Sequence, residues 1–347
     1  MKKIKSSLWR NAMLVLALFF FGLVLYSSRQ DLNKTWLLLK NVSLVMALLL
    51  PLLQLISYFL VSNYYRSFLS VFGSNISAAR AFASTTALNF VNQILPSGGA
   101  SGTTYLIYAF KDVAKPGELT LIQLGRYLFA FLTYAPLLVV AYVWLLIEGN
   151  LNHQLEVALL ALFIIALPGT VLLIAAIRNQ SLVDRLVSAV LRFINRVVGL
   201  FTRRPHTIEV SRSRGFLKEF SNGAEFIRSQ RGNLLKPYLF MQLSTLVEVS
   251  IVATAFFVLG VSVNPAAILV AFTAANIAGA ISIIPGDVGV HELAVITVLS
   301  YIGVDQGTAI AGTLLYRVFN KLIVMAIGFG FYVKLIRPLI KNARANT

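Results

Sequence analysis

Seven ionisable residues lie inside otherwise hydrophobic stretches of this chain, and they are the residues with the clearest chemistry. They are Arg126, Glu248, Asp287, His291, Glu292, Arg317 and Lys321. A charged side chain at the centre of a bilayer costs at least about 2.5–3.5 kcal/mol, so it normally faces a partner or water. An arginine guanidinium can hold a phosphate through two parallel hydrogen bonds. The set therefore predicts either a buried ion-pair network or a site for a charged headgroup.

Both signs of charge are present, so two interpretations of the arginines stay open. In the first, Arg126 and Arg317 only neutralise buried carboxylates within a helix bundle. In the second, the two guanidiniums bind the phosphate of a substrate, while Asp287 and Glu292 receive a cationic headgroup or a proton. Lys321 lies one helical turn after Arg317, where it either shares that phosphate or extends to the membrane surface.

Two segments interrupt the hydrophobic pattern with proline and glycine. The first has apolar arms at 81–95 and 103–110, and its break contains Pro96, Gly98 and Gly99. The second has arms at 266–284 and 290–304, and its break reads Pro285-Gly286-Asp287-Val288-Gly289. Such backbone survives at membrane depth only when it is buried in protein or lines a wet cavity. We therefore predict two helical hairpins with unwound tips, of which the second either spans or re-enters the membrane.

The two broken segments are followed by matching arginines. Arg126 comes thirty residues after Pro96, and Arg317 comes thirty-two residues after Pro285. The predicted topology has the first hairpin entering from the cytoplasm and the second from outside, so the two halves of the chain are related by inversion. Paired interrupted segments at corresponding positions are typical of a transporter's midplane binding site.

Other polar side chains near the breaks are candidates for lining such a cavity. Asn89, Asn92 and Gln93 share one helix face, at positions i, i+3 and i+4; their alternative role is hydrogen bonding between helices. His291 lies four residues after Asp287, but no second histidine, HExxH motif or Ser/His/Asp set completes a metal or hydrolase site. We therefore expect no metal, no cofactor and no catalytic residue.

The composition places these residues in a membrane protein. Of the 347 residues, 58% are hydrophobic and 12% are charged, against about 45–50% and 25% in soluble domains. Spans of about 20 residues are predicted at 11–28, 36–62, 119–147, 155–177, 237–260 and 308–333. The expected fold is an all-α polytopic bundle of six to eight transmembrane helices, with two broken hairpins in inverted halves. The absence of cysteine excludes disulfides and thiolate sites.

The basic residues predict orientation. A net charge of +17 would indicate nucleic acid in a soluble protein, but here lysine and arginine gather in alternate loops, so we expect no nucleic-acid partner. The 178–236 segment carries twelve of the thirty, and the 148–156 loop carries none. The positive-inside rule then puts both termini in the cytoplasm and the protein in the plasma (inner) membrane. The chain divides into a first membrane half (1–177), a basic cytoplasmic linker (178–236) and a second membrane half (237–347).

The sequence resembles the family of the lysylphosphatidylglycerol synthase transmembrane region, a flippase-like membrane domain. The resemblance rests on the segment 89–102 with its Leu-Pro-x-Gly-Gly core, on Arg126, on the segment 285–292, and on Leu315-Tyr316-Arg317. Asp287 departs from the small residue of the family pattern. The resemblance implies movement of modified lipids between leaflets, with related proteins serving lipid-linked sugars. In the full synthases a soluble aminoacyl-transferring domain follows; the sequence ends fourteen residues after Val333, so we expect no lysyl transfer and no enzyme activity.

The function expected from these observations is translocation of an amphipathic phospholipid or lipid-linked headgroup through a midplane cavity. The partners are membrane lipids, and the substrate is anionic or lipid-linked. The alternative is a membrane subunit or enzyme acting on lipid-linked donors, in aminoacyl- or glycosyl-lipid synthesis. The candidate substrate-binding residues are Asn89, Asn92, Gln93, Pro96, Gly98, Gly99, Arg126, Pro285, Gly286, Asp287, Gly289, His291, Glu292, Tyr316 and Arg317.

The linker gives the first testable prediction. Residues 182–201 have apolar side chains at helical period, with Arg185, Arg192 and Arg196 on the opposite face, which predicts an amphipathic helix lying on the inner leaflet. A peptide of residues 182–201 should bind vesicles that contain anionic lipid, because each arginine gains about 1 kcal/mol near an anionic surface. Circular dichroism during vesicle titration measures the binding, and equal binding to neutral vesicles would remove the electrostatic part of the prediction.

Overall fold

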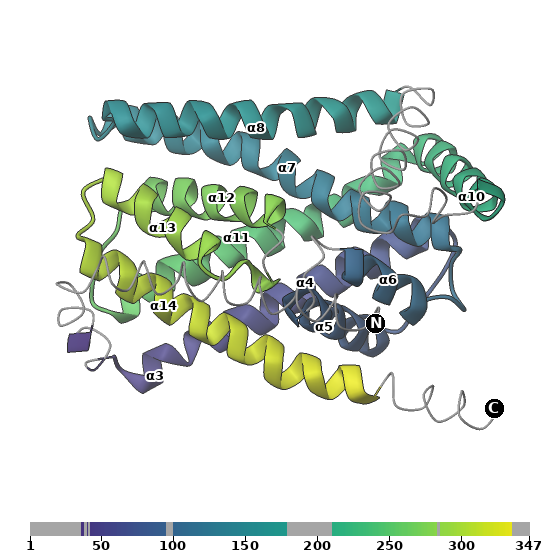
Figure 1. Ribbon diagram of the computed structural model, residues 1–347, viewed down its shortest axis with the longest axis horizontal. Helices are drawn as coiled ribbons and strands as arrows, with labels where there is room; N and C mark the ends of the chain where they lie inside the picture. The colour runs from purple at the N-terminus through teal and green to yellow at the C-terminus, as the bar shows by residue number, and fades with distance from the viewer. Residues whose placement is uncertain are drawn as a thin grey trace, which may run out of the picture.

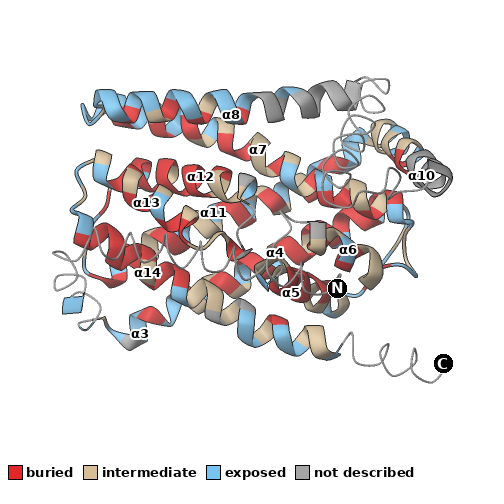
Figure 2. Cartoon of the chain, in the orientation of Figure 1, coloured by how far each residue is buried: buried red, intermediate tan, exposed pale blue. Residues whose placement is uncertain are grey.

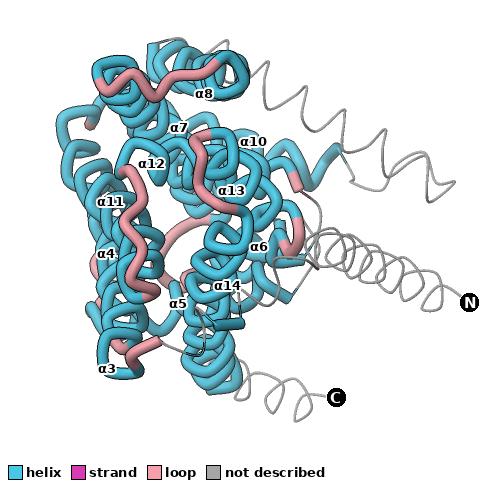
Figure 3. The backbone as a smooth tube through the Cα atoms, turned by 90° about the vertical axis from the view of Figure 1, so that its left-hand side faces the viewer, coloured by secondary structure: helices cyan, strands magenta, loops and turns pink. Residues whose placement is uncertain are grey.

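The computed structural model describes residues 36–37, 40, 42–94, 100–178, 210–282 and 285–334, which form helices and connecting loops without a strand (Figure 3). The predicted span 11–28 and the amphipathic segment 182–201 lie outside the described residues. The α-helices are α3 (Leu44–Ala47), α4 (Leu49–Val71), α5 (Ala78–Ile94), α6 (Ala100–Ala109), α7 (Pro116–Ile147), α8 (His153–Arg178), α10 (Val210–Ser229), α11 (Leu235–Val258), α12 (Pro265–Ile281), α13 (Val290–Tyr301) and α14 (Gln306–Ile323). Short turns of 3₁₀-helix precede α11 (Arg231–Leu234) and α13 (Pro285–Asp287), and a π-turn (Val324–Gly328) continues α14.

Four helical segments are long and apolar enough to cross a membrane, at Val45–Val71, Pro116–Ile147, Arg231–Val258 and Gln306–Lys334. They confirm the predicted spans at 119–147, 237–260 and 308–333, and α8 occupies the predicted span at 155–177. The protein is thus an all-α polytopic membrane protein. Large apolar side chains of α7 and α8 remain exposed, as Figure 2 shows along the outer face of α8, where lipid would cover them.

The predicted span at 36–62 is wrong in its boundaries. The helix α4 runs to Val71, nine residues beyond the predicted end. Its last three turns contain polar and aromatic residues that lowered the apparent hydrophobicity, yet Tyr64, Tyr65 and Ser67 are buried. They face protein rather than lipid, so a purely apolar sequence is not required there.

The two membrane halves have corresponding elements. A long helix (α4, α11) is followed by a hairpin of two shorter helices (α5 and α6, α12 and α13) and then by an arginine-bearing helix (α7, α14). The two long helices α4 and α11 pack along each other. Figure 1 shows the hairpins entering the bundle from opposite ends and pointing toward its centre. This is the arrangement that the repeated sequence pattern predicts.

The second hairpin turns back within the bundle. Its tip residue Gly286 accepts a hydrogen bond from Lys321, which lies near the middle of the segment Gln306–Lys334. Its outer ends, where α12 begins and α13 ends, lie together at one end of the bundle (Figure 1). Of the two alternatives that the sequence left open, this geometry favours re-entry.

The outer ends of the hairpins are fixed by polar contacts. At the base of the first, Arg80 forms a bidentate ion pair with Asp112 at 2.6 and 2.9 Å and donates to the carbonyl of Ala109. The hydrogen bonds from this guanidinium hold the pKa of Asp112 below its usual value. At the base of the second, the side-chain amide of Asn152 donates to the carbonyl of Tyr301. Both hairpins are thus anchored at their outer ends.

The second part of the linker packs on the membrane domain. In α10, Phe220 is buried and Phe226 stacks on Phe72. A Cβ at Gly117 of α7 would lie 2.6 Å from the backbone nitrogen of Phe220, so the two helices touch through backbone. This part of the linker therefore packs against α7 and against Phe72, which follows α4.

Two glycines of the last helix provide a matched test of this packing. A Cβ at Gly328 would lie 2.7 Å from Cβ of Phe90 and 2.8 Å from the carbonyl oxygen of Thr86, both on α5, whereas nothing lies within 4 Å of a Cβ at Gly330. Gly328→Ala should push α5 away and cost about 1–3 kcal/mol of stability. Gly330→Ala should be neutral or stabilising, because alanine favours helix. Thermal unfolding of the purified variants in detergent measures both, and equal melting temperatures would contradict the close packing of α5 on the π-turn Val324–Gly328.

Candidate functional site

The tip of the second hairpin is an unwound turn whose conformation explains its sequence. Gly286, Asp287 and Gly289 have φ angles of 61°, 54° and 87°. This left-handed region costs a β-carbon-bearing residue free energy, and glycine and aspartate tolerate it best. The Pro-Gly-Asp-x-Gly pattern thus permits a turn that releases the carbonyl of Gly286 from the helical hydrogen-bond ladder.

Two cations of α14 bind that released carbonyl. The guanidinium Nη2 of Arg317 lies 2.8 Å from the carbonyl oxygen of Gly286, and the ammonium Nζ of Lys321 lies 2.7 Å from the same atom. The two cations lie one helical turn apart and therefore share one face of α14. The carbonyl at the tip is thus satisfied by charge-assisted hydrogen bonds, which are stronger than neutral ones.

Lys321 also joins the two hairpins. Its ammonium donates to the side-chain carbonyl of Gln93, in the last turn of α5. A Cβ at Gly286 would lie 2.5 Å from that same oxygen, so glycine is needed for the two hairpins to approach. The last turn of α5 thus contacts the tip of the second hairpin, while Pro96, Gly98 and Gly99 lie outside the described residues.

Glu292 has two partners that connect the hairpin to α14. Its Oε1 lies 2.6 Å from Nε of Arg317, and its Oε2 accepts a hydrogen bond of 2.7 Å from the backbone nitrogen of Gly289. Glu292 and Arg317 are each 6% exposed, so the ion pair is buried. The carboxylate therefore caps the first turn of α13 and neutralises the arginine at the same time. For Arg317, the contacts match the counter-ion interpretation.

The neighbouring polar residues complete the second-half cluster. His291 is 3% exposed, its ring centroid lies 5.8 Å from that of Tyr316, and its Nε2 atom has no hydrogen-bond partner among the described residues. Asp287 lies against Gly279 of α12, where a Cβ would be 3.1 Å from the carboxylate. The structure thus brings together the predicted residues from Gly286 to Glu292 with Tyr316 and Arg317.

The first-half arginine has a different environment. Arg126 donates through Nη1 to the hydroxyl of Tyr65 at 3.2 Å and to the amide oxygen of Asn89 at 3.4 Å. Its guanidinium carbon also lies 5.9 Å from the centroid of the Tyr65 ring, within the range of a cation–π interaction. Among the described residues no carboxylate lies within ion-pair distance of Arg126. All of its contacts are with neutral groups.

Glu248 is a partly buried carboxylate that interacts electrostatically with Arg126. It accepts its hydrogen bond, however, from the hydroxyl of Ser57 at 3.0 Å. The two arginines at corresponding positions are therefore not equivalent in this conformation. Arg317 is bound to a carboxylate and a backbone carbonyl, whereas Arg126 retains a positive charge without a contacting anion.

The three amides of the first hairpin do not share one partner. Asn89 contacts Arg126 of α7, Gln93 contacts Lys321 of α14, and the side chain of Asn92 lies where a Cβ on Gly102 of α6 would be. The oxygen of Asn92 is buried without a hydrogen-bond partner among the described residues. Asn89, Asn92 and Gln93 therefore contact three different helices, although they lie on one face of α5.

Lys321 joins the two hairpins, although it is not among the candidate substrate-binding residues predicted from the sequence. Its ammonium contacts the side-chain oxygen of Gln93 and the carbonyl oxygen of Gly286. Its spacing of one turn from Arg317 was the available signal. Tyr65, the aromatic partner of Arg126, had no signal in the sequence, since tyrosines are common in this chain.

The buried ion pair can be tested against an exposed one. Glu292→Ala leaves the charge of Arg317 buried and unpaired, which should cost about 3–5 kcal/mol, and the added Arg317→Ala should recover part of that loss. The Arg80–Asp112 pair, with side-chain exposures of 36% and 58%, should show a coupling below about 1 kcal/mol. Double-mutant cycles from unfolding in detergent measure both couplings. A larger coupling at the exposed pair would contradict the role given to Glu292.

The chain matches the family described as lysylphosphatidylglycerol synthase TM region over residues 12–328. Neither the curated proteins nor the solved structures give a match. The matched range contains both hairpins, both arginines and the helix that carries Lys321. The chain therefore belongs to the lysylphosphatidylglycerol synthase TM region family and is an integral membrane protein with a lipid-related role.

Proposed function

We propose that this protein translocates an amphipathic phospholipid, or a lipid-linked headgroup, between the two leaflets of the membrane. The observation that carries the proposal is the contact between the two hairpins, made where Lys321 binds both Gln93 and Gly286. Among the described residues, this junction lies where the hairpins that enter from opposite ends approach each other. A conformational change that separates the tips on one side at a time would give alternating access.

The arginines supply positively charged partners for a phosphate that crosses the membrane. A charged headgroup cannot cross about 30 Å of hydrocarbon without a partner. Arg126 is the better partner in this conformation, because its described contacts are neutral and its guanidinium fork matches a phosphate. Arg317 is held by Glu292 and Gly286. The asymmetry supports a cycle in which one arginine is available to substrate while its counterpart is held by the protein.

The orientation of the protein belongs to the same proposal. The end of the bundle that holds the base of the first hairpin carries Arg66, Arg80, Lys111 and Lys115, and we place it in the cytoplasm together with both termini. The opposite end carries Glu148, which accepts hydrogen bonds from Trp144 and Asn150. In this orientation α5 and α6 enter from the cytoplasm, and α12 and α13 enter from outside.

A substitution that keeps charge but removes the guanidinium fork tests the proposal. Arg126→Lys should insert and fold, yet lose about tenfold or more of the transfer of a fluorescent phospholipid, because the two parallel hydrogen bonds are lost. The measurement is dithionite quenching of the labelled lipid in vesicles that contain the purified chain and no aminoacyl or glycosyl donor. The matched control is Arg80→Lys, in the same half but paired with Asp112 at the surface.

The outcomes separate the two functions. Transfer by the unmodified chain alone supports translocation over a role as a synthase subunit. Near-normal transfer by Arg126→Lys would remove the arginine as a phosphate ligand and leave the carboxylates, Glu292 first, as the candidates. An equal loss in Arg80→Lys would show that the effect is structural.

A further inference from the structure

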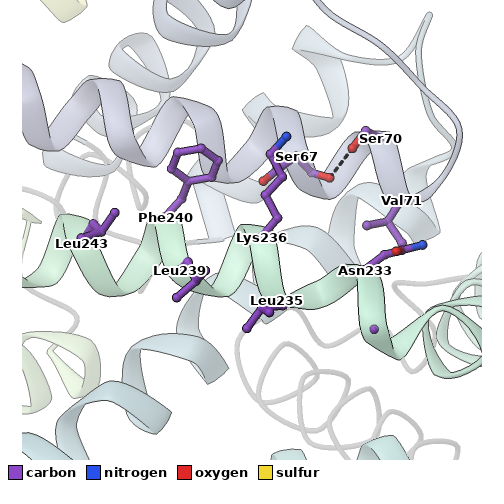
Figure 4. Close-up of a pocket in the computed structure, with 10 residues that line it drawn as sticks. Ser67, Ser70, Val71, Asn233, Leu235, Lys236, Leu239, Phe240 and Leu243 are labelled. Atoms are coloured by element: carbon purple, nitrogen blue, oxygen red, sulfur yellow. Dashed lines mark hydrogen bonds between the residues drawn. The ribbon is translucent and has the colours of Figure 1, made fainter.

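A groove of about 640 Å³ lies between the last turns of α4 and the first turns of α11, away from the hairpin junction (Figure 4). Its lining residues are Ser67, Ser70, Val71, Gly232, Asn233, Leu235, Lys236, Leu239, Phe240 and Leu243. Figure 4 shows Lys236 and Phe240 projecting from α11 toward α4, with Ser67 and Ser70 on the facing helix. The groove is therefore a cleft between the two corresponding long helices of the membrane halves.

The polar groups of the groove lie at one end and favour an anion. Lys236 is the only charged residue among the described residues that line the groove. The hydroxyls of Ser67 and Ser70 donate to backbone carbonyls of their own helix, at 3.0 and 2.7 Å. The amide of Asn233 uses one of its two hydrogens on Gln230 and retains the other. The donors available to a ligand are thus the ammonium and this amide, and the described lining contains no carboxylate.

The rest of the groove is apolar and open to the surroundings of the bundle. Leu239 and Leu243, one helical turn apart on α11, are each 49% exposed. The span begins at Arg231, which puts Lys236 about 8 Å along the helix and Leu243 about 10 Å farther, at 1.5 Å per residue. Lysine at that depth reaches the headgroup region, and the leucines lie in the hydrocarbon region.

We propose that this groove binds one phospholipid, with its phosphate on Lys236 and an acyl chain along Leu239 and Leu243. The polar end matches the headgroup in charge and depth, and the apolar side matches the chain. A free phosphate would use only the first part of the site. The site is separate from Arg126 and the hairpin tips, so it does not depend on the proposed translocation.

Three probes separate the parts of the ligand in native mass spectrometry of the delipidated full chain. Phosphatidic acid carries both parts, diacylglycerol with the same chains lacks the phosphate, and glycerol 3-phosphate lacks the chains. Lys236→Gln should weaken phosphatidic acid about fivefold, the effect of one lysine near an anionic surface, and leave diacylglycerol unchanged. The matched control is Lys334→Gln, an exposed lysine that ends the helical segment Gln306–Lys334.

A second pair of variants tests the apolar part without touching charge. Leu243→Trp should fill the groove and weaken both phosphatidic acid and diacylglycerol. Leu246→Trp is its control, since Leu246 is 47% exposed on the same helix but does not line the groove. Equal effects of Lys236→Gln and Lys334→Gln would overturn the phosphate assignment. Equal effects of the two tryptophan variants, or binding of glycerol 3-phosphate as tight as that of phosphatidic acid, would overturn the lipid assignment.

Discussion

A backbone carbonyl inside a membrane needs a hydrogen-bond donor, because hydrocarbon supplies none. The carbonyl of Gly286 meets this requirement with two cations of α14, and the surrounding structure depends on how those cations are held in turn. Arg317 needs an anion, and Glu292 provides it from the first turn of α13. Lys321 needs further oxygens, and Gln93 provides one from the other hairpin. One unwound turn therefore connects both hairpins to α14.

The polar groups at the centre of the bundle are balanced in charge but unevenly paired. Three cations (Arg126, Arg317, Lys321) share this region with three carboxylates (Glu248, Asp287, Glu292), and only one pair is in direct contact. A fully paired network would be a static scaffold with little affinity for another ion. Here Arg126 is satisfied by a phenol and an amide. A phosphate can replace these neutral partners without breaking a buried ion pair. This is a physical reason to propose Arg126 as the phosphate ligand.

The periphery of the protein holds the hairpins from outside so that their tips can meet. The Arg80–Asp112 pair closes the base of the first hairpin, Asn152 fixes the end of the second, and α10 covers the start of α7. Close helix approaches at Gly328 and Gly312 set the position of α14 against α5 and α11. In a membrane, helices associate through such close packing rather than through the hydrophobic effect. The groove beside Lys236 lies where this packing is open to lipid.

The sequence by itself determined the all-helical membrane fold, the positions of the two hairpins and their matching arginines. The length of a hydrophobic segment and its Pro/Gly breaks are local properties, and the bilayer restricts which backbone structures they can form. It also identified the break at 285–289, and the structure shows that its residues adopt the left-handed backbone that glycine and aspartate tolerate. It could not determine that α4 extends through Tyr64 and Tyr65, since these residues are buried by α7 and α11 rather than by lipid. The turn of the second hairpin within the bundle, the separate partners of Asn89, Asn92 and Gln93, and the contact of Lys321 with Gln93 and Gly286 were decided only by the tertiary structure. Each of these features depends on which helices pack against each other. Contacts between residues as far apart in the sequence as Gln93 and Lys321 cannot be predicted from local residue spacing.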